Sequence, residues 1–463
     1  MKTIVHNPFD GEPIAEVPLI DWLEIDKWLN EAQSLHRDRS AWLPVPERIA
    51  ILQRATDLMR ERAEDLAVQI VREGGKPLTD ARVETQRAIN GVELCVHELF
   101  GDGGKEVPMD LTDAGAGRTA YTFREPIGPV VAISAFNHPL NLIVHQVGPA
   151  VAVGCPVVIK PALETPLSCQ SFVNILYEAG LPEPWCRFAP CSNDVAQKMV
   201  TDPRTAFFSF IGSAKIGWML RSQLAPGTRV ALEHGGAAPV IVDREVERKP
   251  LIASLLKGGF YHSGQVCVSV QRVFVPTDEL QDFADELGVA AEGLVVGDPA
   301  DPDTECGPLI RSAEVGRVER WVDEAVKGGG TLVAGGQRIG DTIFEPTVIV
   351  NPPVDAKVSN QEIFGPVICV YGYDEIDEAI KQANALPYAF QAAVFTDRLS
   401  VANHCIETLA GSTILVNDHT AFRVDWMPFA GLKQSGLGTG GIGYTMADMS
   451  IRKMAVLNWI DQR

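Results

Sequence analysis

The sequence has little positive charge. Its 463 residues include 40 lysines and arginines against 60 aspartates and glutamates, which gives a formal net charge of −20. Nucleic acids and anionic membranes both bind basic surfaces, so this imbalance argues against either as a partner. Because the overall field also repels small anions, an anionic ligand would need cations placed locally at its site.

The sequence also lacks closely paired cysteines and a long apolar run. Its nine cysteines form no Cys-x-x-Cys pair, so neither a zinc site nor a disulfide framework is indicated, and we expect no metal. Scattered thiols, odd in number, are typical of reduced cysteines in the cytoplasm. The most apolar stretch, 142–159, is interrupted by polar residues, glycines and prolines, and indicates a buried helix and strand rather than a membrane span.

The chain is too long for one hydrophobic core, so we expect two or three domains. Short apolar runs alternate with helical patterns from residue 127 onward, which predicts α/β domains with parallel sheets. A first series has apolar runs at 130–133, 157–159, 207–210 and 230–232, with helical segments at 140–153 and 166–180. A second series has runs at 239–242, 272–275, 347–350, 367–370 and 413–416. Helices are also predicted over 21–72 and 80–100, and a strand over 450–459.

Three residues form a minimal set for covalent attack on a carbonyl group. Cys267 supplies a thiol nucleophile, Glu233 a carboxylate that moves protons, and Asn137 an amide NH₂ that faces an oxyanion. Glu233 and its following glycines come directly after an apolar strand, at the strand end where α/β proteins build their sites. A buried inert thiol is the alternative for Cys267 and is the interpretation we favour for the other eight cysteines.

The sequence motifs around these residues resemble those of the NAD(P)-dependent aldehyde dehydrogenase family, and the resemblance extends over nearly the whole chain. Single words such as Gly-Ser-x-x-x-Gly are weak signals, but their combined order is specific. The matching words are Arg124-Glu125-Pro126-Ile127-Gly128, Phe136-Asn137-His138-Pro139, Lys160-Pro161-Ala162, Gly212-Ser213 with Gly217, Glu233-His234-Gly235-Gly236, Gly264-Gln265-Val266-Cys267, Glu362-Ile363-Phe364-Gly365-Pro366 and Pro428-Phe429-Ala430-Gly431.

The resemblance implies a mechanism and a set of cofactor contacts. Cys267 would form a thiohemiacetal and then a thioester, Asn137 would hold the oxyanion, and Glu233 would activate water. Lys160 would contact the adenosine ribose of NAD or NADP, and the turn at Gly212, Ser213 and Gly217 its pyrophosphate. Glu362 and Phe364 would hold the nicotinamide ribose and ring, and the segment containing Ile133, Ser134 and Phe136 would line the cleft.

The chain departs from the family pattern at several places. Leu163 stands where relatives that prefer NAD often place glutamate, and the acid is Glu164, one step on. A carboxylate repels a 2′-phosphate, so its displacement leaves NADP admissible beside NAD. Thr439-Gly440 stands where many relatives have Arg-Glu.

The resemblance further points to the branch that acts on small anionic aldehydes. Arg87, His138, His419 and Arg423 are the predicted substrate contacts, because guanidinium groups bind phosphonate or carboxylate bidentately. Apolar Val266 counts against this, since some relatives that bind anions have arginine there. We therefore predict oxidation of a phosphonate or phosphate aldehyde. The alternatives are a generalist or succinic-semialdehyde-type dehydrogenase and, less favoured because Glu233 is present, a CoA-acylating enzyme or a catalytically silent binding protein.

The fold implied by the resemblance is α/β and aldehyde dehydrogenase-like, with three parts. A Rossmann-like NAD(P)-binding domain would span 1–105 and 128–235, and an α/β catalytic domain 236–430. A small β flap for oligomerisation would combine 106–127 with 436–463. Because an exposed strand edge needs a partner, a homodimer or homotetramer is expected.

Overall fold

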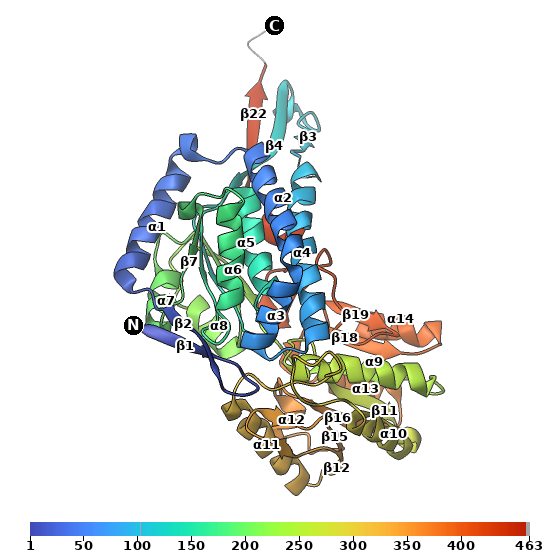
Figure 1. Ribbon diagram of the computed structural model, residues 1–463. Helices are drawn as coiled ribbons and strands as arrows, with labels where there is room; N and C mark the ends of the chain where they lie inside the picture. The colour runs from blue at the N-terminus through green and yellow to red at the C-terminus, as the bar shows by residue number, and fades with distance from the viewer. Residues whose placement is uncertain (102, 460–463) are drawn as a thin grey trace.

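The computed structural model describes residues 1–101 and 103–459. Its architecture is α/β, with two sheets of mainly parallel strands and helices on both faces of each (Figure 1). The first sheet has the order β21-β9-β8-β5-β6-β7. Its strands are β5 (Val130–Ile133), β6 (Val157–Lys160), β7 (Cys186–Phe188), β8 (Phe207–Ile211), β9 (Arg229–Glu233) and β21 (Gly436–Leu437). The predicted apolar runs of the first series are thus confirmed as strands.

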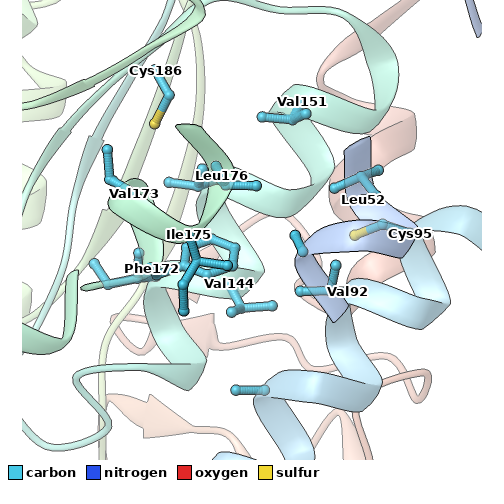
Figure 2. Close-up of a cluster of buried hydrophobic side chains, with 14 of the residues drawn as sticks. Leu52, Val92, Cys95, Val144, Val151, Phe172, Val173, Ile175, Leu176 and Cys186 are labelled. Carbon is cyan, nitrogen blue, oxygen red and sulfur yellow. The ribbon is translucent and has the colours of Figure 1, made fainter. Parts of the chain in front are cut away.

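Burial on both faces explains why these strands are continuous apolar runs. Within β5, Val130 and Ala132 pack on one side of the sheet and Val131 and Ile133 on the other. Figure 2 shows part of the first core, where side chains of neighbouring helices meet. The helices on this side are α2 (Val45–Glu61), α3 (Ala63–Gly74), α4 (Leu78–Gly101), α5 (Asn141–Val153) and α6 (Leu167–Glu178), and on the other side α1 (Trp22–Arg37), α7 (Asn193–Thr201) and α8 (Ala214–Arg221).

The second sheet repeats this arrangement with the order β12-β15-β16-β11-β10-β18-β19. Its strands are β10 (Ala238–Val242), β11 (Val270–Pro276), β12 (Thr331–Ala334), β15 (Thr347–Val350), β16 (Val367–Tyr373), β18 (Gln391–Phe395) and β19 (Thr413–Val416). Helices α9 (Arg248–Phe260) and α10 (Leu280–Glu292) share one core with it, and α11 (Ser312–Lys327), α12 (Lys357–Asn360), α13 (Ile376–Asn384) and α14 (Leu399–Thr408) the other. The second predicted series of strands is also confirmed.

A separate three-stranded antiparallel sheet extends from the unit built on the first sheet, at the top of Figure 1. It consists of β3 (Glu106–Val107), β4 (Arg118–Pro126) and β22 (Ser450–Asn458), with β22 paired to β4 along its whole length. Within the predicted flap segment 436–463, β21 instead joins the first sheet, and α15 (Ile442–Asp448) packs against α4 and α5. Residues 460–463 of that segment, and residue 102 of the predicted first domain, lie outside the described residues. The domain boundaries and the oligomeric role of the flap stay predictions.

Short antiparallel pairs complete the fold. They are β1 (Lys2–His6) with β2 (Pro13–Pro18), β13 (Arg338–Ile339) with β14 (Ile343–Phe344), and β17 (Tyr388–Ala389) with β20 (Leu432–Lys433). Within the described residues, no helix is both long and apolar enough to cross a membrane. No grouping of His, Cys, Asp or Glu side chains suited to a metal ion occurs in the same part of the chain.

A buried ion pair fixes the start of α5. Glu84 and Lys76 are fully buried and in contact. The second carboxylate oxygen of Glu84 accepts hydrogen bonds from the backbone N–H groups of Leu140 and Asn141, at 3.0 and 3.1 Å. Glu84 therefore holds the first turn of α5, which directly follows the loop that carries Asn137.

Lys76→Met should lower the free energy of unfolding by about 3 kcal/mol, because it leaves the Glu84 carboxylate buried without its cation. The double variant Lys76→Met/Glu84→Gln should lose less than Lys76→Met alone, since no uncompensated charge remains. Urea denaturation measures both. Lys2→Met is the control: it removes the exposed Lys2–Glu16 pair and should cost less than about 1 kcal/mol. Equal losses in the Lys76 and Lys2 variants would contradict the role given to the buried pair.

Candidate active site

A cavity of about 490 Å³ is lined by residues from both α/β units. Ile133 and Glu233 end parallel strands of the first sheet, and Gly212 directly follows a third, so this unit contributes the carboxyl ends of its strands. Such edges are where open α/β sheets bind ligands. The predicted site residues that the structure brings together on this cavity are Arg87, Ile133, Ser134, Phe136, Asn137, His138, Gly212, Ser213, Glu233, Cys267, Glu362, Phe364 and Arg423.

A tight left-handed turn positions Cys267. His262, Ser263 and Gly264 all have positive φ, at 47°, 56° and 69°. Glycine is required at 264 because a Cβ there would lie 2.2 Å from the carbonyl oxygen of Gly365. The Gln265 side chain then fixes the loop: its Oε1 accepts from the Ile310 N–H at 2.9 Å. The cysteine that follows lines the cavity on a segment held in place on both sides.

Burial raises the pKa of the Cys267 thiol above its usual range, and the nearby Glu233 carboxylate raises it further, while Arg423 opposes both. The resting thiol is therefore protonated at neutral pH. A nucleophilic thiolate at this position needs a base that removes the proton during attack. Glu233, whose charge acts on this thiol, is the carboxylate placed to do so.

Asn137 is buried beside the loop that carries the cysteine. Its amide nitrogen donates to the backbone oxygen of Gln265 at 2.9 Å. An amide NH₂ has two donors, so the second N–H remains for a ligand in the cavity. The amide is thus oriented by a hydrogen bond to the loop two residues before Cys267.

The two carboxylate oxygens of Glu233 face different surroundings. Oε1 lies 3.6 Å from Nη1 of Arg423. Oε2 faces Gly440, where a Cβ would lie 3.1 Å away from it. Burial raises the pKa of Glu233, and the charge of Arg423 opposes this shift. A carboxyl group with a raised pKa can both accept and return a proton near neutral pH.

Asp425 neutralises Arg87. The guanidinium of Arg87 donates to both carboxylate oxygens, at 3.0 and 2.8 Å. Asn141 and His145 add contacts to Oδ1 at 3.1 and 2.7 Å. Burial alone would raise the pKa of Asp425, but His145 and Arg87 outweigh it and hold the pKa far below its ordinary value. Arg87 lines the cavity as half of an ion pair rather than as an uncompensated cation.

Arg423 has more unused hydrogen-bonding capacity than Arg87. Its Nε is buried with no partner among the described residues. Its guanidinium carbon lies over the ring of Phe429, 3.7 Å from the ring centre, in a cation–π contact. Its contacts to Glu233 and to Nδ1 of His145 are long, at 3.6 and 3.5 Å. A ligand anion could therefore replace these long contacts with its own hydrogen bonds to the guanidinium, at a small cost in free energy.

His138 lines the cavity as a neutral ring. Burial lowers its pKa well below the ordinary value, and the charges of Lys76 and Arg87 lower it further. Its Nε2 lies 3.0 Å from the hydroxyl of Tyr261. His138 can therefore hydrogen-bond a substrate, but it adds no positive charge to the site.

Another set of lining residues suits a dinucleotide. Ser134 Oγ and Glu362 Oε1 are buried with no partner among the described residues, so both need a polar ligand or water. Glu362 lies against the backbone of Gly235, where a Cβ would come within 1.5 Å of Oε1. Burial raises the pKa of Glu362 to about 8. Phe364 packs edge-on against Phe136 with ring centres 5.8 Å apart. These residues fit the ribose and ring of a nicotinamide cofactor.

Three predicted site residues lie outside the residues that line this cavity. Lys160 ends β6 and donates to the carbonyl of Pro161 at 3.2 Å. Gly217 on α8 packs against His234, where a Cβ would lie 2.0 Å from the ring. His419 packs on α9 against Gly258. Their ligand contacts stay predictions.

Sequence reasoning missed several lining residues. Glu314, Arg317 and Trp321 come from α11. Tyr261 directly precedes the left-handed turn before Cys267, and Asn141 is the first residue of α5. The α11 residues belong to an ordinary amphipathic helix, so no motif marks them. Only the packing of α11 beside the cavity gives them access to it.

Comparison with known proteins places this site in a family. The family model described as "Aldehyde dehydrogenase family" matches residues 1–455. The 3-sulfolactaldehyde dehydrogenase of Priestia aryabhattai is 35% identical over 99% of this chain and 95% of its own length. Aldehyde dehydrogenase 21 of Physcomitrella patens, solved with the reaction product succinate, is 35% identical with a TM-score of 0.95, covering 100% of this chain and 96% of that one. Glyceraldehyde-3-phosphate dehydrogenase GapN of Methanocaldococcus jannaschii, solved with NADP, is 32% identical with a TM-score of 0.93, covering 98% of both chains.

The raised pKa of Glu362 predicts a pH-dependent cofactor affinity. Below about pH 8 the carboxyl group is neutral, and as the pH rises through that value it becomes a charged and stronger acceptor for ribose hydroxyls. Binding of NAD or NADP, measured by calorimetry, should therefore tighten from neutral to alkaline pH. Glu362→Gln is neutral throughout and should remove this dependence. The same pH profile in both proteins would show that another group is responsible.

Proposed function

The chain belongs to the aldehyde dehydrogenase family, and on that premise we propose that it oxidises small anionic aldehydes to carboxylic acids with NAD or NADP. The proposal of an anionic substrate rests on the surroundings of Arg423. It is a buried guanidinium at the reactive end of the cavity whose Nε lacks a partner among the described residues and whose ion pair with Glu233 is long. An anion on the substrate supplies the missing hydrogen bonds.

In the proposed mechanism, Cys267 attacks the aldehyde carbon while Glu233 removes the thiol proton. The second N–H of Asn137 and the backbone N–H of Cys267 hold the oxyanion, each worth about 3 kcal/mol of barrier. Bound NAD or NADP supplies the hydride acceptor that turns the adduct into a thioester. Glu233 then deprotonates the water that hydrolyses the thioester, and the thiol is restored.

The position of Arg423 favours a short substrate. Its guanidinium lies 3.6 Å from the Glu233 carboxylate, and its charge lowers the pKa of the Cys267 thiol, so it lies close to the reacting groups. An aldehyde that reaches from the thiol to this guanidinium has few carbon atoms between its carbonyl and its anionic group. His138 and Tyr261 give the same pocket hydrogen-bonding groups without further charge.

The names of the relatives fit this substrate class. They include a sulfonated aldehyde, a phosphorylated aldehyde and the dicarboxylate succinate as substrate or product. We place sulfonate, phosphate and phosphonate aldehydes first. A succinic-semialdehyde-type activity is the second candidate, favoured by the relative solved with succinate. Retention of Glu233, Cys267 and Asn137 on one cavity favours both over a CoA-acylating enzyme or a silent binding protein.

Cofactor choice, location and assembly belong to the same proposal. Glu164, the acid near Lys160, forms an ion pair with Arg311 at 3.1 Å. This engagement leaves room for the 2′-phosphate of NADP as well as for NAD. All nine cysteines are free thiols, which supports a cytoplasmic protein. The strand edges of β3 and β22 support assembly into a homodimer or homotetramer.

Replacing Arg423 should separate anionic from neutral substrates. The kcat/KM of Arg423→Met should fall more than ~100-fold for 3-sulfolactaldehyde, glyceraldehyde 3-phosphate or succinic semialdehyde, the loss expected for about 3 kcal/mol of anion recognition. The fall for propanal should be much smaller. Reduced-cofactor absorbance measures all four substrates. Arg221→Met is the control, because Arg221 is exposed and does not line the cavity, and it should lower none of them selectively. Equal losses for anionic and neutral aldehydes would refute the anion site.

Variants of Cys267 and Glu233 should be impaired in different steps of the reaction. Cys267→Ala should abolish aldehyde oxidation while cofactor binding persists, because no thioester can form. Glu233→Gln should slow thioester hydrolysis by about 10²-fold or more, since the water loses its base. Rapid-mixing absorbance should then show a burst of reduced cofactor before a slow steady state, and the burst should itself form more slowly than in the unsubstituted protein because Glu233 also takes the thiol proton. Turnover by Cys267→Ala, or an unchanged steady state in Glu233→Gln, would remove that residue from the mechanism.

A further inference from the structure

A second, much smaller cavity lies on the other side of Glu233. Its volume is about 30 Å³. Glu233, Phe210, Ile211 and Phe429 line both this cavity and the main one, so the Glu233 side chain forms part of the wall between them. The polar side chains that line the small cavity, besides Glu233, are His145, Gln146, Ser209, Thr439, Thr445 and Asp448.

The small cavity has the size and polarity to hold water. A water molecule needs about 10–15 Å³ of such space and two to four polar partners. Gln146 is 1% exposed, and its Oε1 has no partner among the described residues, while its Nε2 donates to Ile133 and Ser209. An orphaned buried acceptor on the wall of a polar cavity indicates an ordered water that donates to it.

The geometry of Glu233 connects the two cavities. Its Oε1 faces Arg423, which lines the main cavity, and its Oε2 faces Gly440, which lines the small one. A proton accepted on one oxygen can therefore be released from the other after rotation of the carboxyl group. The charged or titratable groups around this path are Arg423, Arg87, Cys267 and His145 on the side of Glu233, and Arg229 beside Asp448.

Asp448 ends α15, lines the small cavity and is partly exposed. Burial raises the pKa of its carboxyl group, and the charge of Arg229 opposes this. A partly exposed carboxylate of this kind can take a proton from an internal water and release it to solvent.

The reaction needs such an outlet. Conversion of an aldehyde to a carboxylate releases one proton from the thiol when the thioester forms. It releases a second from water when the thioester is hydrolysed. Both arise beside Glu233, whose side chain is 15% exposed, and the cofactor and substrate occupy the main cavity during the cycle.

We propose that Glu233 transfers these protons to a water in the small cavity. The water transfers them to Asp448, which releases them to solvent. In each transfer the protonated Glu233 gives up its proton to the water, and the water gives one of its own protons to the Asp448 carboxylate. The water is neutral again, Glu233 is again a base, and Asp448 loses the proton to bulk water. Asp448 is a positioning residue in this scheme, because it acts through the water and Glu233. The proposal rests on the roles given above to Cys267 and Glu233.

Glycine at position 440, where many relatives have glutamate, leaves the Oε2 side of Glu233 open to the small cavity in this chain. An added Cβ would lie 3.1 Å from Oε2 of Glu233 and 3.0 Å from the carbonyl oxygen of Phe429. A side chain here would therefore occupy the space between Glu233 and the water. The backbone of Gly440 is outside the left-handed region, so it is this contact that disfavours a larger residue.

Hydrolysis of p-nitrophenyl acetate tests the proposal without cofactor. Acylation of Cys267 releases a burst of p-nitrophenolate, and the steady state then reports hydrolysis of the acyl-enzyme. Asp448→Asn should keep the burst and slow the steady state at least ~10-fold, less than the ~10²–10⁴-fold that a direct base contributes. Formate in the buffer should restore the rate, and the solvent deuterium isotope effect on hydrolysis should rise. Gly440→Ala should slow hydrolysis in the same way, with no rescue by formate.

The control is Asp397→Asn, an exposed carboxylate that lines neither cavity and should behave as the unsubstituted protein. An unchanged steady state in Asp448→Asn would overturn the proposal. So would loss of the burst, which would show a structural role, or slow hydrolysis without formate rescue and isotope effect. Absence of a burst in the unsubstituted protein would instead count against the nucleophile, and thus against the proposed function itself.

Discussion

Partial burial of Glu233 and Cys267 at one cavity wall is the constraint on which the rest of the site depends. In a poorly solvated site each group resists ionisation, and the negative charge of Glu233 raises the pKa of the Cys267 thiol. The pair therefore rests with the thiol protonated and the carboxyl group ready to exchange a proton. Arg423 moderates both shifts, so the same guanidinium that suits a substrate anion also sets the resting charge of the reacting groups.

The cations of the site are not equivalent, and their surroundings explain why. The Asp425 carboxylate contacts Arg87, Asn141 and His145. The ion pair neutralises Arg87, which then lines the cavity without an uncompensated charge. Arg423 has only long polar contacts and an aromatic face. In a protein with a net charge of −20, one incompletely satisfied guanidinium beside the nucleophile gives the local positive potential that an anionic aldehyde requires.

Much of the fold could be predicted because of how parallel sheets are buried. Strands covered on both faces become continuous apolar runs, so those of the two series coincided with observed strands such as β5 and β15. The flap was harder to predict, because β21 and α15 lie in the same C-terminal segment as β22 and yet pack on the first unit. Nothing in their local pattern indicates which neighbour they meet. That choice depends on the surface already formed by α4 and α5.

The sequence by itself determined the family, the order of the elements and the identity of the thiol, carboxylate and amide, because these follow from short words whose chemistry is local. Only the tertiary structure decided which charges face the cavity. Arg87 and Asp425 are 338 positions apart, and their pairing exists only where α4 meets the loop before Phe429. The two-sided placement of Glu233 was decided in the same way. Charge and proton access depend on distances through space, and these are set by packing rather than by neighbours along the chain.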